Sequence, residues 1–329
     1  MMPRILFISK GTDSASTRYR ALDYFPALQA AGWQCAHIST QGGLWQRWRI
    51  LHAAKQADVV VVLRKTFPAW YTRRLRKAAK KLVFDFDDAV FAKSSGAPSA
   101  KRARQFTHMV GLADMVWAGN AFLAQRAGQH NRNVQIVPTA IAMQRYRDET
   151  EKSQIYIDLV WIGSRSTSRY LEMALPMLQR AYATLPALRL KIIADFDFID
   201  AGVPTRAVRW SAEEEAQELA SAHIGIAPMP DNTWTRGKCA LKVLQYMAAG
   251  LPVISANAGA NAEVIEHGMT GLLCNSDEEW LTAITQLAND PQRCAAMGEA
   301  GRQRCAQHYS QEAVFRRIKD SLGQLMIEE

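Results

Sequence analysis

Short apolar runs alternate along this chain with longer segments whose apolar residues recur at helical spacing. The run Asp58–Leu63 reads Asp-Val-Val-Val-Val-Leu and is apolar on both faces, as expected of a strand that helices cover on both sides of a parallel sheet. We therefore expect an α/β fold with a doubly wound parallel sheet. The first half contains six predicted strands, at residues 4–9, 34–39, 58–63, 81–85, 115–117 and 134–138.

A polar stretch at residues 142–154, rich in Arg, Asp, Glu and Lys, interrupts this pattern and is interpreted as a linker. The last predicted helix, from about Gln311, has an apolar face that should pack on another element. We predict domains at residues 1–148 and 149–308, followed by a C-terminal helix at 309–329. The second domain contains predicted strands at residues 157–163, 188–194, 208–210, 224–227 and 252–255.

The length of 329 residues suits two domains, each large enough to bury a core. The positive charge is uneven, because residues 1–150 carry 23 Lys and Arg against 9 Asp and Glu, whereas the remainder carries 17 against 22. A basic half suits nucleic acid, an anionic membrane or an acidic acceptor. Because no zinc-finger, RNA-recognition or heptad pattern accompanies it, we do not expect a nucleic-acid partner.

The cysteines are odd in number, scattered, and never in CxxC spacing with histidines. They predict neither a disulfide framework nor a zinc site, and they favour a reducing cytoplasm. No apolar stretch approaches the length that spans a bilayer, so any membrane contact should be peripheral.

The segment 236–271 has the chemistry of a phosphate site. Lys238 and Lys242 are four residues apart, so on a helix begun near Gly237 they would share one face. The start of such a helix would add free backbone N–H groups and the positive end of the helix dipole. The alternative is a buried helix whose lysines extend to water.

The same segment resembles a known family. Gln245-Tyr-Met-Ala-Ala-Gly-Leu-Pro-Val-Ile, with Glu263 and Gly268-Met-Thr-Gly271 beyond, is similar to the donor site of retaining nucleotide-sugar glycosyltransferases of family four, the group 1 glycosyl transferases. The resemblance implies a GT-B fold: two Rossmann-like domains facing a central cleft, with the C-terminal helix returning to the N-domain. It also implies that residues 1–148 bind the acceptor and 149–308 the donor.

The chain departs from the family where many members carry two glutamates for the donor sugar and the ribose. These positions read Gly237 and Gln245 here. Gln245 can still hydrogen-bond ribose hydroxyls, and Lys238 and Asp231 are candidates to compensate for Gly237. Glu263 matches the family glutamate that follows the small-residue loop; the alternative is a surface acid at a helix start.

A second phosphate motif follows the first strand of the second domain. Here a βα turn is expected to hold the donor diphosphate. An ordinary turn is the alternative. In the resemblance Arg169 takes the place of the family lysine, while Ser164 replaces the family arginine. The candidate residues are Gly163, Ser164, Arg165, Thr167 and Arg169.

Two groups in the first domain are candidate ligand contacts. Gly11 lies in a loop that would let the backbone approach the donor, and Arg18 and Arg20 follow as candidate acceptor contacts. Asp87 and Asp88 end a predicted strand, where clustered acids suit acceptor binding or proton transfer. The alternatives are arginines exposed at a helix start and acids that cap a helix.

Residues 67–81 combine aromatic residues with a strongly basic helix. Such a cluster suits an anionic membrane surface, although a solvated helix face gives the same pattern.

Together these features predict a glycosyltransferase that moves a sugar from a nucleotide-diphosphate donor to a glycan or lipid-linked acceptor, with retention. Lys238, Lys242 and Arg169 would stabilise the leaving diphosphate, so no metal or other cofactor is expected. A nucleotide-sugar epimerase and a non-catalytic nucleotide-sugar or glycan-binding module remain alternatives. The sequence leaves open the base, the sugar and the acceptor.

Overall fold

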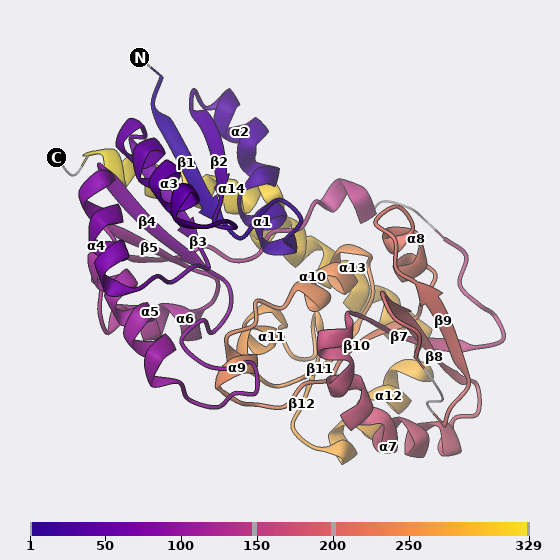
Figure 1. Cartoon of the computed structure of the whole chain (residues 1–329). Coiled ribbons are helices and arrows are strands. Elements are labelled where there is room, and N and C mark those ends of the chain that lie inside the picture. Colours follow the sequence, from indigo (N-terminus) through magenta and orange to yellow (C-terminus); the bar gives the residue numbers. More distant parts are fainter. Residues whose placement is uncertain (1, 147–149, 199–201, 328–329) are drawn as a thin grey trace. The chain divides into compact units, whose positions relative to one another are not determined.

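The computed structural model describes residues 2–146, 150–198 and 202–327, which form two compact units. Unit 1 contains the chain up to Ala140, the short segment 232–239, and the chain from Gln311 onward. Unit 2 contains residues 141–231 and 240–310. Each unit is built on its own parallel sheet (Figure 1).

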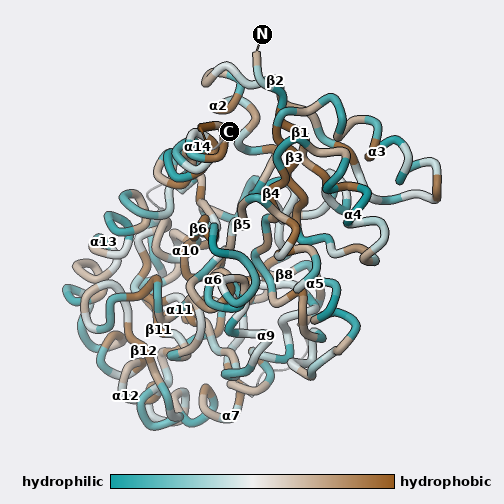
Figure 2. The backbone as a smooth tube through the Cα atoms, turned by 90° about the vertical axis from the view of Figure 1, so that its left-hand side faces the viewer, coloured by the Kyte–Doolittle hydropathy of each residue, from teal (hydrophilic) through white to brown (hydrophobic). Residues whose placement is uncertain are grey.

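The sheet of unit 1 has six parallel strands in the order β2-β1-β3-β4-β5-β6. Its central strand β3 is buried along its whole length, which explains why four consecutive valines are tolerated there. Figure 2 shows the hydrophobic character of β3 and β4. The strands are β1 (Arg4–Ser9), β2 (Gln34–Ser39), β3 (Val59–Leu63), β4 (Lys81–Phe86), β5 (Met115–Ala118) and β6 (Val134–Ile136).

Alternate residues of these strands enter two separate cores. Leu6, Val60 and Phe84 share one core with the helices α3, α4, α5 and α6. Ile5, Val61 and the opposite face of the sheet pack on α2 and α14. The helices of unit 1 are α1 (Ala15–Arg20), α2 (Phe25–Ala30), α3 (Leu44–Gln56), α4 (Ala69–Ala78), α5 (Ala100–Leu112), α6 (Ala121–Gly128), α9 (Thr233–Arg236) and α14 (Gln311–Ile327).

The sheet of unit 2 is also six-stranded and parallel, in the order β12-β11-β10-β7-β8-β9. Trp161 and Ile192 face a core with α7 and α12, whereas Val160 and Val253 face a core with α10. The strands are β7 (Ile157–Gly163), β8 (Leu188–Ala194), β9 (Thr205–Arg209), β10 (Ile224–Ala227), β11 (Val253–Ala256) and β12 (Gly271–Cys274).

Capping side chains mark several helix starts in unit 2. Ser276 accepts a hydrogen bond from the backbone N–H of Glu279, and Asp290 caps a helix whose first residue is Pro291. The helices are α7 (Ser168–Thr184), α8 (Glu215–Ala220), α10 (Leu241–Ala248), α11 (Gly259–Val264), α12 (Asp277–Ala288) and α13 (Pro291–His308).

The expected fold class is confirmed, since both units carry doubly wound parallel sheets and α14 belongs to unit 1. The sequence pattern missed the strand β12, a short run that begins with glycine. It also placed β9 at residues 208–210, whereas this strand begins at Thr205. The domain boundaries at 148 and 308 stay predictions. The residues 147–149 lie outside the described residues, and the segment 232–239 belongs to unit 1.

Gly298 sets the close approach of α13 to the turn that follows α10. A Cβ atom there would lie 2.8 Å from the carbonyl carbon of Gly250 and still nearer its oxygen. We expect Gly298→Ala to lower the free energy of unfolding by about 1–3 kcal/mol, because α13 must shift. Urea denaturation followed by circular dichroism measures this change.

Gly323→Ala is the matched control, because a Cβ atom at this helical glycine meets nothing within 4 Å. It should leave the stability unchanged or raise it by about 0.5–1 kcal/mol. Equal losses from both substitutions would contradict the close packing of α13 on α10.

Candidate active site

The turn after β7 is the first part of the candidate site, and it lies within unit 2. Gly163 ends the strand, and Ser164 and Thr167 then form a reciprocal capping box. The backbone N–H of Arg165 donates to Asp195 Oδ1 at 3.1 Å, which ties this turn to the end of β8. The turn therefore has a fixed backbone at the carboxyl edge of the sheet, where doubly wound folds bind ligands.

Lys242 brings a positive charge to this turn. Its Nζ lies 3.4 Å from Thr167 Oγ1 and 3.8 Å from the centroid of the Trp161 ring. A Cβ atom on Gly163 would lie 2.7 Å from the same ammonium group. Because Gly163 has no side chain, the Lys242 ammonium group can occupy this space. A cation beside a capped turn is an arrangement that suits a bound anion.

Tyr246 fixes the helix α10 that carries Lys242. Its hydroxyl accepts a hydrogen bond from the N–H of Ile162 at 3.0 Å and donates to the carbonyl of Ile226 at 3.1 Å. Its ring packs where a Cβ atom of Gly225 would otherwise stand. Because the buried Tyr246 side chain is hydrogen-bonded to both β7 and β10, it fixes the position of α10 relative to the end of β7.

The other predicted donor contacts are more scattered within unit 2. Arg165 and Arg169 are exposed beside the turn, with their guanidinium groups over the rings of Phe196 and Tyr170. Glu263 is exposed on α11, Gln245 is buried in α10, and Asp231 is exposed before the start of α9. The turn and its surroundings thus bring together Gly163, Ser164, Arg165, Thr167, Arg169 and Lys242. The roles of these residues, like the donor roles of Glu263, Gln245 and Asp231, stay predictions.

The prediction of a helix that begins near Gly237 is wrong. Helix α10 begins only at Leu241, and Ala240 before it adopts a left-handed conformation with φ of 54°. Lys238 therefore does not share a helix face with Lys242. Its Nζ instead lies 2.9 Å from Asp88 Oδ1 within unit 1.

A network of opposite charges surrounds the two acids after β4. Arg64 pairs with Asp87 through Nε at 3.0 Å and also pairs with Asp88. Burial, and then the nearby Asp87 carboxylate, raises the pKa of Asp88, while Arg64 and Lys238 act in the opposite direction. Arg64 has φ of 55°, a backbone conformation that is costly for a residue other than glycine. The acceptor roles of Asp87 and Asp88 stay predictions.

Arg20 was expected to contact the acceptor, but the structure places it in the interior of unit 1. It is buried, its Nε donates to Asp85 Oδ2 at 2.9 Å, and its Nη2 donates to the carbonyl of Val137 at 2.9 Å. These bonds direct the guanidinium into the interior of unit 1. Arg18 is half-buried and stacks on Tyr19, and Gly11 has φ of 147° as expected of a glycine loop. Their ligand roles stay predictions.

Sequence reasoning missed Asn120, which holds the segment around Lys238. Its Oδ1 caps α6 by accepting from the N–H of Leu123, while its Nδ2 donates to the carbonyls of Arg236 and Lys238 at 3.0 and 2.9 Å. The only sequence signal was an ordinary N-cap asparagine. Arg64 was also missed, because no local pattern predicts its left-handed backbone.

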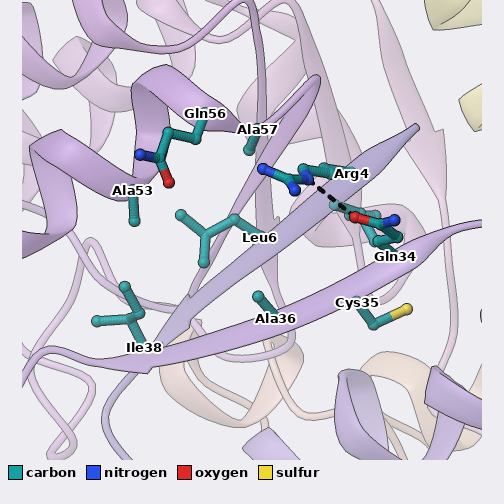
Figure 3. Close-up of a pocket in the computed structure, with 10 residues that line it drawn as sticks. Arg4, Leu6, Gln34, Cys35, Ala36, Ile38, Ala53, Gln56 and Ala57 are labelled. Carbon is teal, nitrogen blue, oxygen red and sulfur yellow. Dashed lines mark hydrogen bonds between the residues drawn. The ribbon is translucent and has the colours of Figure 1, made fainter. Parts of the chain in front are cut away.

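A cavity of about 290 Å³ lies elsewhere on unit 1, between β1, β2 and α3 (Figure 3). It contains none of the predicted site residues. Its lining includes Leu6, Ile38 and Ala53, with the hydrogen-bonded pair of Arg4 and Gln34 at its rim. We therefore do not assign it to the candidate active site.

Within residues 2–146, 150–198 and 202–327, no three His, Cys, Asp or Glu side chains are grouped so that they could hold a metal ion. No helix in these ranges is both long and apolar enough to cross a bilayer.

Comparison with known proteins identifies the segment that carries helix α10. Residues 171–290 match the family model of Glycosyl transferases group 1. The resemblance predicted from the segment around Gln245 is thereby confirmed. The matched residues run from α7 to the end of α12 and include Lys238 and Lys242.

Curated relatives match shorter stretches. Human alpha-1,3/1,6-mannosyltransferase ALG2 is 34% identical over 85 residues, which are 26% of this chain and 20% of that protein. A GDP-mannose-dependent phosphatidylinositol monomannoside mannosyltransferase of Mycobacterium tuberculosis is 33% identical over 81 residues, 24% of this chain and 21% of that protein. The matches thus span about a fifth of the length of these relatives.

Solved structures resemble the chain over almost its whole length. Sucrose-phosphate synthase from Thermosynechococcus elongatus gives a TM-score of 0.78 at 15% identity, covering 99% of this chain and 100% of that one. Anabaena Alr3699/HepE, solved with UDP and glucose, gives 0.73 at 14% identity, covering 98% of this chain and 100% of that one. At this identity the likeness establishes the fold, which is GT-B.

Substitution of Asp85 tests the buried ion pair between Asp85 and Arg20. The side chains of Asp85 and Arg20 are 1% and 3% exposed. We expect Asp85→Asn to lower the free energy of unfolding by about 3–5 kcal/mol, because it leaves the Arg20 charge buried without its partner. Urea unfolding of the purified protein measures the loss.

A double variant serves as the control for this pair. Arg20→Met combined with Asp85→Leu removes both charges and should recover most of the loss. A single variant as stable as the wild type would contradict the buried pair, and so would a double variant that is no better than the single one.

Proposed function

We propose that the protein is a glycosyltransferase that uses a nucleotide-diphosphate sugar and transfers a hexosyl group, with retention, to a glycan or lipid-linked acceptor. The observation that carries this proposal is the position of Lys242 beside the Gly163–Thr167 turn. Lys242 belongs to the stretch 171–290 that matches Glycosyl transferases group 1, and the turn precedes that stretch. Two of the named relatives are mannosyltransferases, and HepE was solved with UDP and glucose. These names support a sugar nucleotide as the donor.

In this proposal the diphosphate binds against the turn. Lys242, with Arg169 and Arg165 nearby, supplies positive charge where negative charge develops as the bond between the sugar C1 and the phosphate oxygen breaks. The acceptor oxygen forms the new bond to C1, and its proton passes to the released diphosphate. With side chains supplying the charge, the reaction needs neither a metal ion nor another cofactor. The role of Lys238 as a second contact to the diphosphate stays a prediction.

We further propose a cytoplasmic protein whose acceptor is part of an envelope polysaccharide, working at the inner face of the membrane. The strongly basic first half of the chain supports this part of the proposal. Residues 67–81 are the segment that the sequence offers for contact with an anionic surface.

A second candidate is a non-catalytic module that binds a sugar nucleotide. Gly237 favours it, because the family resemblance implies a glutamate at this position. A Cβ atom on Gly237 would lie 2.7 Å from the backbone nitrogen of Ala89, so no larger side chain fits there. Release of free sugar from the donor separates an enzyme from a binder.

Thermal denaturation with uridine, guanosine and adenosine diphosphates tests the donor site without an acceptor. We expect one of the three to raise the melting temperature, because a ligand at 100 times its dissociation constant adds about 2.7 kcal/mol to stability. The absence of a shift with all three would contradict a nucleotide-diphosphate site.

The substitution Lys242→Ala tests whether this lysine stabilises the leaving diphosphate. With the preferred donor, we expect release of free sugar to fall by about 10²–10³-fold, because the leaving diphosphate loses a positioned cation. The exposed Arg180, which pairs with acids of α12, supplies the control substitution Arg180→Ala in the same unit. Wild-type turnover in a folded Lys242→Ala protein would refute the assignment, and equal losses in both variants would also count against it.

A further inference from the structure

Helices α3 and α4 of unit 1 present large aromatic side chains to solvent. Trp45 is 80% exposed, Trp48 59% and Trp70 48%. Leu44, at the start of α3, is 78% exposed. Several exposed indoles grouped on one surface indicate an interaction site, whereas single exposed apolar residues need no explanation. We call this surface the aromatic-basic patch; it consists of Leu44, Trp45, Arg47, Trp48, Arg49, Trp70, Arg73 and Arg74.

Contacts between the two helices join the patch into one surface. The guanidinium of Arg47 on α3 lies 5.7 Å from the ring centroids of Trp70 and Tyr71 on α4. The Tyr71 hydroxyl donates to the carbonyl of Arg47 at 3.0 Å. On α3 the rings of Trp45 and Trp48 are 6.2 Å apart and edge-on. The indoles are therefore held on two helices that contact each other within unit 1. Figure 1 shows the helices α3 and α4.

The charge around these indoles is almost entirely positive. Residues 41–80 contain ten Lys and Arg and a single acid, Asp58. Lys80 lies 2.7 Å from that carboxylate, so the acid is itself neutralised. Arg73 and Arg74 are exposed on α4 beside Trp70. The patch thus combines amphipathic rings with an excess of exposed cations.

We propose that the aromatic-basic patch docks on an anionic lipid bilayer. Tryptophan rings prefer the headgroup level of a membrane, and neighbouring Lys and Arg side chains meet the negative surface charge. A saccharide or small ligand would instead need a concave site. The cavity of unit 1 lies toward the other end of α3, at Ala53 and Gln56, and contains none of the indoles.

This inference rests on the membrane location in the proposed function and deepens it by naming the surface that makes the contact, while lipid docking itself needs neither donor nor acceptor. It goes beyond the basic helix of residues 67–81, since it assigns the leading contacts to Trp45 and Trp48 on α3. A failure of lipid binding would leave the transfer of sugar untouched, and a failure of sugar transfer would leave the patch untouched.

Vesicle sedimentation of the full chain tests the proposal. The probes are vesicles of phosphatidylcholine alone and vesicles in which about a third of the lipid is phosphatidylglycerol. We expect the protein to sediment with the anionic vesicles and to be released as salt is raised, because the Debye length falls from about 10 Å at 0.1 M to about 3 Å at 1 M. Quenching of tryptophan fluorescence by brominated lipid should accompany binding.

Two variants of the patch separate its components. Trp45→Ser with Trp48→Ser should weaken binding by at least about ten-fold at every salt concentration, because it removes the apolar contact. Arg73→Ser with Arg74→Ser should weaken it by about 25-fold at low salt, since each basic residue near an anionic leaflet contributes about five-fold. All four side chains are exposed, so folding should be unaffected.

The matched controls lie outside the patch. Met173→Ser removes an exposed apolar residue of α7, and Arg316→Ser with Arg317→Ser removes two exposed cations of α14. Both should bind like the wild type. Absence of binding to anionic vesicles, or binding that the tryptophan variant leaves unchanged, would overturn the proposal. So would tryptophan-dependent self-association, or tryptophan-dependent binding to an acidic polysaccharide in place of vesicles.

Discussion

Each sheet in this protein is parallel and covered by helices on both faces, and this constraint determines where chemistry can take place. Parallel strands all end at one edge, so side chains that follow different strands are brought together there. In unit 2 the ends of β7 and β8 place Gly163 and Asp195 around one turn. In unit 1 the ends of β3 and β4 place Arg64 beside Asp87 and Asp88. The two buried cores are thus the reason that polar groups gather at the edges.

The two edges differ in the groups that surround their charges. In unit 1, Arg20, Arg64 and Lys238 stand against Asp85, Asp87 and Asp88, so the cluster compensates itself. In unit 2, Lys242 lies beside a hydroxyl and an indole ring. The paired charges of unit 1 fix the backbone that carries them.

The sequence predicted most of the fold because buried parallel strands leave a direct signature, as in the valine run of β3. It predicted the turn after β7 for the same reason, since Gly163 ends such a strand. The phosphate role of this turn stays a prediction. The sequence pattern failed at Lys238, where spacing implied one helix although Ala240 turns left-handed and breaks it. The sequence pattern also gave no sign of contacts between residues far apart in the chain. Examples are the hydrogen bond from Asn120 to the carbonyl of Lys238 and the one from Arg20 to Asp85.

The segment 232–239 has a consequence for the chain as a whole. Because this segment and α14 belong to unit 1, the backbone passes from one unit to the other four times. No single cut therefore yields two intact halves. A chimera that exchanges unit 1 with that of a relative must carry three separate stretches of chain. The eight residues that precede Ala240 must travel with it, although they lie within the family match at residues 171–290, most of which belongs to unit 2.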